Sequence, residues 1–467
     1  MNKKLSFLEA ISPMVVMLGL MVFGTIYHLK VVPLIILSAI FAGFVGLKAG
    51  LTWDEMLSGI VNKLSTAMPA VLILLSVGIV IASWIMCGTV PMMIYYGLQT
   101  LTPTYLYVAA FFITTIVSLL IGTSWGTLGT VGISIMGIAH ALDVNVAIAA
   151  GAVVSGTFLG DKISPLSDSV NLSAIVSDTP LYSHIKHLFY TTVPVIIISM
   201  IVYTIIGVTT HHQTTVNSGE ITKLLTSLDA IFTWNVLLLL PPLIVIYGAV
   251  TEKPALPSLL ASSFVAALLA IFTQGFSLQS VCTAILNGFN ISMIKDKGLN
   301  PEQIAPAVKK LISQGGLIDI FPVLMILFAA FAFAGIVSKA GCLEIIGEKL
   351  LVKAKTTGSL VLTNVLTCIG TCMVMGSIYL SIIIPGEIFK ESYKKHNLQS
   401  QNLSRALQES SSITAPLIPW SETGAFTAAT LGLSTFAFAP WSFVCYLGPI
   451  VTVIFAYAGI SMTKIKD

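Results

Sequence analysis

The chain has 467 residues, of which 56% are hydrophobic and 9% are charged, and its formal net charge is +3. Soluble domains contain about 25% charged residues, so this composition excludes a soluble globular protein and indicates one that crosses a lipid bilayer many times. The small net charge gives no reason to expect a nucleic-acid partner.

Apolar segments follow one another along almost the whole chain. Since a helix needs about 20 apolar residues to cross the hydrocarbon layer, they predict an all-α polytopic membrane protein with about 10–12 transmembrane helices. The predicted helices span residues 11–29, 31–50, 66–87, 103–121, 145–160, 189–208, 231–250, 256–273, 316–338, 357–375, 402–413 and 440–462. Segments 90–100 and 342–354 are too short to cross, and we expect them to be interfacial or re-entrant.

A polar stretch in the middle of the chain separates two sets of apolar segments. It predicts a first repeat at 1–208, a linker at 209–230 and a second repeat at 231–467. Clusters of Ser, Thr, Asn, Gly and charged residues between apolar segments are typical of such linkers.

Motifs recur in the two repeats at a separation of about 250 residues. The Gly/Ser/Thr segment 122–125 is matched by 376–379, and Pro165 is matched by Pro416. Broken helices at corresponding positions of two repeats are a sequence sign of a transport site near the bilayer midplane. Both prolines are therefore predicted to interrupt helices that line such a site.

The positive charge of the connectors indicates how the repeats are oriented. Seven lysines follow the second-repeat helices 316–338 and 357–375, whereas the matching first-repeat connectors 88–102 and 122–144 contain no Lys or Arg. Because Lys and Arg collect on the cytoplasmic side, equivalent connectors are expected to face opposite sides. The sequence thus predicts inverted repeats with broken or re-entrant helices, as in many secondary transporters.

An ionisable cluster interrupts the apolar sequence. Residues 64–142 contain no Asp, Glu, Lys or Arg, and after Asp143 the next charges are Asp161, Lys162 and Asp168, around Pro165. Ionisable groups at membrane depth are costly to bury and are functional candidates by default. Asp161 and Asp168 are predicted to form a Na⁺ site that also takes H⁺, since burial favours the protonated carboxyl and a bound cation favours the ionised one. The alternative for Asp161 is an ion pair with Lys162.

Further oxygen ligands are predicted near this break and its counterpart, because hard cations prefer oxygen. They are Ser164, Ser167 and Asn171 at the first break, Thr123 and Ser124 in the Gly-rich segment, and Ser412, Thr414 and Glu422 beside Pro416. Hydroxyls at such positions also serve helix packing, which is the alternative for them. The alternative for Glu422 is an interfacial position at a helix end.

The motifs resemble those of the NhaC family of bacterial Na⁺/H⁺ antiporters. The resemblance lies in residues 122–127, in Gly-Asp-Lys-Ile-Ser-Pro-Leu-Ser-Asp at 160–168, in 181–185 and in 415–420, and it extends over nearly the whole chain. It implies a cytoplasmic-membrane exchanger with inverted repeats, re-entrant hairpins and elevator-like movement. Some members exchange malate and H⁺ for lactate and Na⁺, and others carry amino acids.

Together these observations predict a secondary transporter that exchanges Na⁺ for H⁺ across the bacterial cytoplasmic membrane. Its predicted partners are the lipid bilayer and the two cargo ions; it needs no cofactor, and its lack of a phosphate-cradling loop argues against ATP hydrolysis. The alternatives are a Na⁺- and H⁺-coupled exchanger of small carboxylates or amino acids, and a channel. An enzyme is not expected, and a homodimer is one oligomeric state the sequence leaves open.

Overall fold

The computed structural model describes residues 5–465 apart from 28, 212–217, 252, 314 and 352–354. In this part of the chain all regular elements are helices, apart from one isolated bridge between Leu398 and Lys464. The first-half helices are α1 (Phe7–Ile26), α2 (Val31–Lys48), α3 (Trp53–Cys87), α4 (Thr89–Thr100), α5 (Leu106–Ile121), α6 (Ser124–Thr127), α7 (Ile133–Ala141), α8 (Val146–Ile163), α9 (Asp168–Val176), α10 (Leu181–His211) and α11 (Ser218–Ile231).

The remaining α-helices are α12 (Leu240–Val250), α13 (Ala255–Phe272), α14 (Leu278–Asn287), α15 (Pro306–Ile312), α16 (Leu317–Lys339), α17 (Cys342–Leu351), α18 (Thr357–Met375), α19 (Ile378–Lys395), α20 (Ser400–Ser411), α21 (Glu422–Leu431), α22 (Thr435–Phe438) and α23 (Phe443–Ala458). Short helical turns are η1 (Pro103–Tyr105), η2 (Leu128–Gly132), η3 (Val236–Leu239), η4 (Ile291–Lys297), η5 (Pro301–Gln303), η6 (Ala415–Leu417) and η7 (Ala439–Trp441).

The described residues contain eight helices long and apolar enough to cross a membrane, or up to ten if each bent pair is one span. This confirms the prediction of an all-α polytopic membrane protein. The predicted helix 231–250 starts a few residues later, at Val236, because the chain bends by 99° between Thr222–Ile231 of α11 and the segment Val236–Gly248. The polar residues Thr233 and Asn235 lie at this bend, and Asn235 caps η3 by accepting from the Leu237 backbone N–H at 3.0 Å.

The predicted linker 209–230 holds the end of α10 and most of α11. Leu224 and Leu228 of α11 are buried, so this helix packs onto the rest of the protein. Residues 212–217 of the linker lie outside the described residues. The division into two repeats around this segment stays a prediction.

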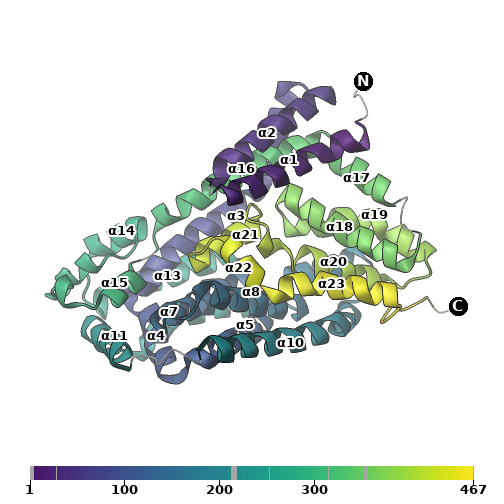
Figure 1. Cartoon of the computed structure of the whole chain (residues 1–467). Helices are drawn as coiled ribbons and strands as arrows, with labels where there is room; N and C mark the ends of the chain where they lie inside the picture. The colour runs from purple at the N-terminus through teal and green to yellow at the C-terminus, as the bar shows by residue number, and fades with distance from the viewer. Residues whose placement is uncertain are drawn as a thin grey trace.

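Two groups of helices lie side by side in Figure 1. One group contains α1, α2, α3, α13 and α16, and the other contains α5, α8, α10 and α23. Glycines allow the closest approaches in the second group: a Cβ at Gly156 of α8 would lie 2.2 Å from the Phe111 carbonyl oxygen of α5, and one at Gly160 would lie 2.3 Å from that of Thr115. This is the small-residue packing typical of membrane helices.

The two halves interrupt their helices in the same way. The helices α5 and α18 end at left-handed glycines, Gly122 (φ 74°, ψ 20°) and Gly376 (φ 65°, ψ 11°). An extended residue follows each glycine, and a new helix then starts: Thr123 (φ −146°, ψ 129°) precedes α6, and Ser377 (φ −128°, ψ 129°) precedes α19. The matching backbone angles agree with a repeat.

A second pair of interruptions matches equally well. Helices α9 and α21 begin at Asp168 and Glu422, and each follows an extended serine, Ser167 (φ −73°, ψ 128°) or Ser421 (φ −74°, ψ 156°). Both pairs are separated by 254 positions, as are Gly122 and Gly376. The predicted match of Pro165 with Pro416 is therefore wrong: this register matches Pro165 with Pro419, while Pro416 lies inside η6, earlier in the same interruption.

Candidate functional site

Two interrupted helices, α8 with α9 and α20 with α21, meet at their breaks. Figure 1 shows α8, α20 and α21 near the middle of the molecule. Ser169 Oγ in α9 donates to Ser412 Oγ at the end of α20 over 3.3 Å. Gln408 of α20 donates from Nε2 to Ser169 Oγ at 3.0 Å and accepts at Oε1 from Ser173 Oγ at 2.8 Å. All four side chains are buried, so a polar network connects the two breaks directly.

A buried ion pair fastens α8 to α20. Lys162 Nζ lies 2.8 and 2.9 Å from the two carboxylate oxygens of Glu409, and both side chains are 0% exposed. Thr191 of α10 donates to Glu409 Oε1 at 2.6 Å and adds a third helix. The alternative that pairs Asp161 with Lys162 is therefore wrong, because the ammonium group of Lys162 is bound by Glu409.

Asp161 lies in the last turn of α8 and is buried. Its carboxylate interacts with the hydroxyl and the backbone N–H of Ser124, the first residue of α6, and with the hydroxyl of Ser167, just before α9. Two separate helix breaks thus supply polar groups to one carboxylate. Asp168 lies close enough to interact with it electrostatically.

Asp168, the first residue of α9, is exposed, whereas Asp161 is not. Tyr379, in the first turn of α19, lies within electrostatic range of Asp168, Asp161 and Glu422. The predicted carboxylates of both halves therefore lie in the same region of the protein. The fold brings together in space what the chain separates by 254 positions.

Glu422, the first residue of α21, is partly buried, and its backbone N–H donates to the Gly376 carbonyl at 2.9 Å. A lysine of a third helix acts on its carboxylate, namely Lys63 of α3. The side chain of Lys63 is buried, and its Nζ lies 5.8 Å from the centre of the Phe331 ring. The second break thus has a buried lysine within electrostatic range of its acid.

Several predicted ligands bind backbone groups at the breaks. Ser164 Oγ donates to the Leu119 carbonyl at 2.9 Å, and Thr414 Oγ1 donates to that of Ser410. Asn171 Nδ2 donates to the carbonyls of Pro165 and Ser167, both at 2.9 Å. These bonds satisfy backbone oxygens freed by the interruptions, which fits a role in holding the breaks.

The other predicted hydroxyls differ in their surroundings. Ser124 and Ser167 face Asp161, and Ser412 reaches the first break through Ser169. Thr123 is partly buried, and its backbone carbonyl accepts from Thr127 Oγ1 at 3.0 Å. The structure therefore gathers Asp161, Asp168, Ser124 and Ser167 into one group.

Three functional candidates escaped the sequence analysis: Lys63, Tyr379 and Glu409. Lys63 directly precedes the uncharged run 64–142, which places it at the start of the most apolar part of the chain and was the available signal. Tyr379 lies in the segment 376–379 that was recognised as a motif only for its small residues. Glu409 carries no local signal, because its partner is 247 residues away.

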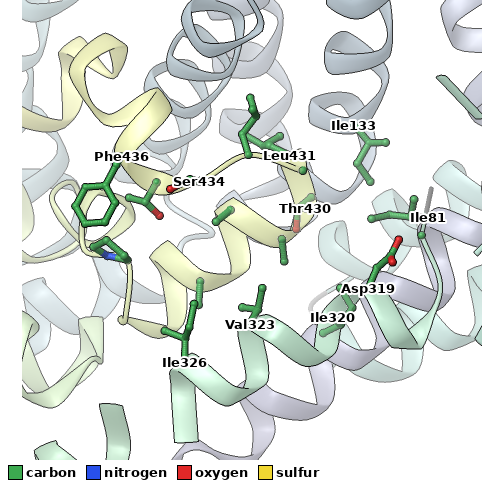
Figure 2. A pocket seen from close by; sticks show the side chains of 18 of the residues that line it. Ile81, Ile133, Asp319, Ile320, Val323, Ile326, Thr430, Leu431, Ser434 and Phe436 are labelled. Atoms are coloured by element: carbon green, nitrogen blue, oxygen red, sulfur yellow. The ribbon is translucent and has the colours of Figure 1, made fainter. Parts of the chain in front are cut away.

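A cavity of about 510 Å³ runs between α16 and α21. Figure 2 shows Val323 and Ile326 of α16 directed toward α21, with Asp319 near one end of the cavity. Pro419, three residues before Glu422, also lines it. The cavity therefore runs along α21 toward the second break.

Within the described residues, no group of three or more His, Cys, Asp or Glu side chains is arranged to hold a metal ion. A cation beside Asp161 would have to take other oxygens, from hydroxyls and freed backbone carbonyls. Such mixed oxygen ligands suit Na⁺ at a broken helix.

Comparison with known proteins identifies relatives that match nearly the whole chain. The profile of the Na⁺/H⁺ antiporter family matches residues 97–170 and 156–460. An uncharacterised Na⁺/H⁺ antiporter of Haemophilus influenzae is 41% identical over 460 residues, which cover 98% of this chain and 97% of the relative.

Two other relatives carry different names. The Na⁺/H⁺ antiporter NhaC of Alkalihalophilus pseudofirmus is 35% identical over 438 residues, 94% of this chain and 91% of the relative. A malate-2H⁺/Na⁺-lactate antiporter of Bacillus subtilis is 29% identical over 418 residues, 90% of this chain and 87% of the relative. The similarity extends across both interrupted helices.

Proposed function

The chain belongs to the Na⁺/H⁺ antiporter family, and we propose that it exchanges Na⁺ for H⁺ across a bacterial cytoplasmic membrane. The observation that carries this proposal is the position of Asp161. Its carboxylate is buried at the junction of two interrupted helices, beside the hydroxyls of Ser124 and Ser167.

The burial of Asp161 couples the two ions. A bare carboxylate in a low-dielectric interior costs several kcal/mol, so the group has to carry either a proton or a cation while it is enclosed. Na⁺ replaces the proton with the help of hydroxyl oxygens, and H⁺ replaces Na⁺ when the proton concentration rises. Because the enclosed site always holds either Na⁺ or H⁺, each crossing of one ion is followed by a return crossing with the other.

Asp168 and Tyr379 complete the proposed site. Asp168 is exposed and lies near Asp161, so its charge attracts cations from water toward the buried carboxylate. Tyr379 offers a hydroxyl near both acids. Na⁺ and H⁺ are cargo in this scheme, and no cofactor or chemical reaction takes part.

The test is Na⁺-dependent proton movement in sealed vesicles that contain the full chain. We expect Asp161→Asn and Asp168→Asn to abolish this movement, because the amide neither ionises nor takes up a proton. Asp296→Asn is the matched control, since Asp296 lies in η4, away from both breaks. Full exchange by Asp161→Asn would contradict the proposal, provided that the variants elute as folded protein.

A second candidate is a Na⁺- and H⁺-coupled exchanger of small carboxylates, of the kind named for the Bacillus subtilis relative. The observation that favours it is the cavity of about 510 Å³, which is much larger than a single Na⁺ requires. Labelled malate and lactate uptake distinguishes the two. Simple antiport moves protons with Na⁺ alone, whereas the second candidate needs an added carboxylate.

A further inference from the structure

Three buried serine hydroxyls form a hydrogen-bonded chain that leads from the first break to the second half of the protein. Ser167 Oγ lies 3.2 Å from Ser169 Oγ, and Ser169 Oγ donates to Ser412 Oγ over 3.3 Å. Gln408 Nε2 also donates to Ser169 Oγ, at 3.0 Å. All four side chains are buried, so these bonds are shielded from bulk water.

The number of hydrogens fixes the direction of this chain. A serine hydroxyl has one hydrogen and two lone pairs. Ser169 gives its hydrogen to Ser412, and Gln408 occupies one of its lone pairs. What remains toward Ser167 is the other lone pair, so Ser167 is the donor in their contact. If the hydrogen of Ser167 pointed elsewhere, two lone pairs would face each other in a buried site, which is costly.

The direction of the chain matters at Asp161, because the Ser167 hydroxyl lies beside its carboxylate. Since the hydrogen of Ser167 goes to Ser169, the hydroxyl turns lone pairs toward Asp161. A lone pair binds Na⁺ or accepts the hydrogen of a protonated carboxyl, whereas it repels a bare carboxylate. The chain therefore favours both occupied forms of the site over the empty form.

We propose that Ser169 and Ser412 are positioning residues, which orient the Ser167 hydroxyl as an acceptor for the transported ions. This inference rests on the proposed function, because it takes Asp161 as the ion site. It gives Ser412 a role other than that of a direct ligand, since its oxygen accepts from Ser169 and does not touch the cargo. A residue of the second half thus sets the affinity of a site in the first half.

Removal of the last acceptor reverses the chain. Without the Ser412 hydroxyl, the hydrogen of Ser169 turns to Ser167, whose own hydrogen then turns to Asp161. A hydroxyl that donates to the carboxylate stabilises the empty ionised form, and an incoming Na⁺ has to displace that bond. Loss of the Ser169 hydroxyl has the same consequence, because the hydrogen of Ser167 then lacks its acceptor.

The experiment measures Na⁺-dependent proton flux in reconstituted vesicles for Ser412→Ala, Ser169→Ala and the double variant. Each should raise the KM for Na⁺ by about fivefold, as expected for the loss of one hydrogen bond, and keep the maximal flux within about twofold. The double variant should have the KM of the single variants, because both act through Ser167. Ser412→Thr retains a hydroxyl and should keep the original KM. A further rise of KM in the double variant means that Ser412 binds the ion directly and overturns the proposal.

Ser173→Ala is the matched control within the same network. Ser173 Oγ donates to Gln408 Oε1 at 2.8 Å, and this bond lies outside the chain from Ser412 to Ser167. A network that served only to pack the two helices would need this bond as much as the others. We expect Ser173→Ala to leave the KM for Na⁺ unchanged, and equal rises of KM for Ser173→Ala and Ser169→Ala overturn the proposal.

Na⁺ binding gives a readout that does not need transport. The Tm of the purified protein in detergent should rise with NaCl relative to choline chloride, and Ser412→Ala should need about fivefold more Na⁺ for the same rise. If the original protein binds Na⁺ but moves no protons with it, the proposed function fails while this titration still tests the chain of hydroxyls. Equal responses of the original protein and Ser412→Ala overturn the inference alone, and a protein that neither binds nor moves Na⁺ overturns both.

Discussion

The first and second breaks share their backbone conformation but use different side chains. At these breaks, Ser167 and Ser421 precede α9 and α21 with similar angles, and the neighbouring interruptions after α5 and α18 turn alike at Gly122 and Gly376. Around the first break there are two aspartates and hydroxyls, whereas at the second a buried lysine lies within electrostatic range of a glutamate. A repeated backbone therefore provides two similar helix breaks, and under the proposed function their side chains determine which of them binds the exchanged ion.

The ion pair between the breaks offers the largest expected effect on stability. Glu409→Gln leaves Lys162 buried without a counter-charge, and breaking such a pair costs about 3–5 kcal/mol. We expect a lower Tm in detergent for this variant. The double variant Lys162→Met with Glu409→Gln should recover most of the lost Tm, because it removes both buried charges. If the double variant loses as much Tm as Glu409→Gln alone, the ion pair does not account for the connection between the breaks.

Alanine substitutions at Gly122, which ends α5, and at Gly376, which ends α18, test whether the surroundings of the two breaks are equally crowded. A Cβ at Gly122 would lie 2.4 Å from Leu166 Cβ, whereas at Gly376 the nearest atom, Phe331 Cε1, is 3.4 Å away. The left-handed conformation alone makes alanine unfavourable by about 1–2 kcal/mol at either position. We expect Gly122→Ala to lose about 2–4 kcal/mol, since it adds a steric clash.

Thermal unfolding of Gly122→Ala and Gly376→Ala in the same detergent checks this difference. Because both variants carry the same backbone penalty, each serves as the other's control. Equal shifts in Tm would mean that the contact between Gly122 and Leu166 does not distinguish the first break from the second.

The serines before α9 and α21 give the smallest expected effects. One substitution should change the stability of the protein, and the other should change the KM for Na⁺. Ser421 Oγ accepts from the Gly424 backbone N–H at 2.9 Å, whereas Ser167 makes no such cap and faces Asp161. Ser421→Ala should therefore destabilise the protein by about 1 kcal/mol and leave the KM for Na⁺ unchanged.

Ser167→Ala should raise the KM for Na⁺ by about tenfold, because a hydroxyl beside the charged site is lost. Its Tm should change little. Vesicle flux measured over a range of Na⁺ concentrations, together with thermal unfolding, separates the two serines. A larger KM change for Ser421→Ala would place the cation at the second break.

Local residue patterns predicted where the helices are interrupted. They did not predict which residues far apart in the chain contact each other. Glycine and proline act on their own backbone, so the breaks near Gly122, Pro165 and Gly376 could be found from residue type. The partner of Lys162 could not, since Glu409 lies 247 residues away and the neighbouring Asp161 was the simpler choice.

Other differences reflect signals that were present but weak. Helix α3 starts at Trp53, well before the predicted 66, because Thr52 and Glu55 form a capping box that extends it through polar residues. The predicted helix 402–413 corresponds to α20 (Ser400–Ser411). This helix is the first part of an interrupted helix that continues through η6 into α21. The second break contains two prolines, Pro416 and Pro419, so the sequence alone did not decide which of them matches Pro165.

The contact of Lys162 with Glu409 also restricts how the protein can move. Both charges are fully dehydrated, and Thr191 ties the same carboxylate to α10. Shifting α8 against α20 would separate these charges in a medium that does not solvate them. Since Asp161, the proposed ion site, is the residue next to Lys162, we expect any displacement that exposes this site to the other side of the bilayer to carry α8, α10 and α20 together.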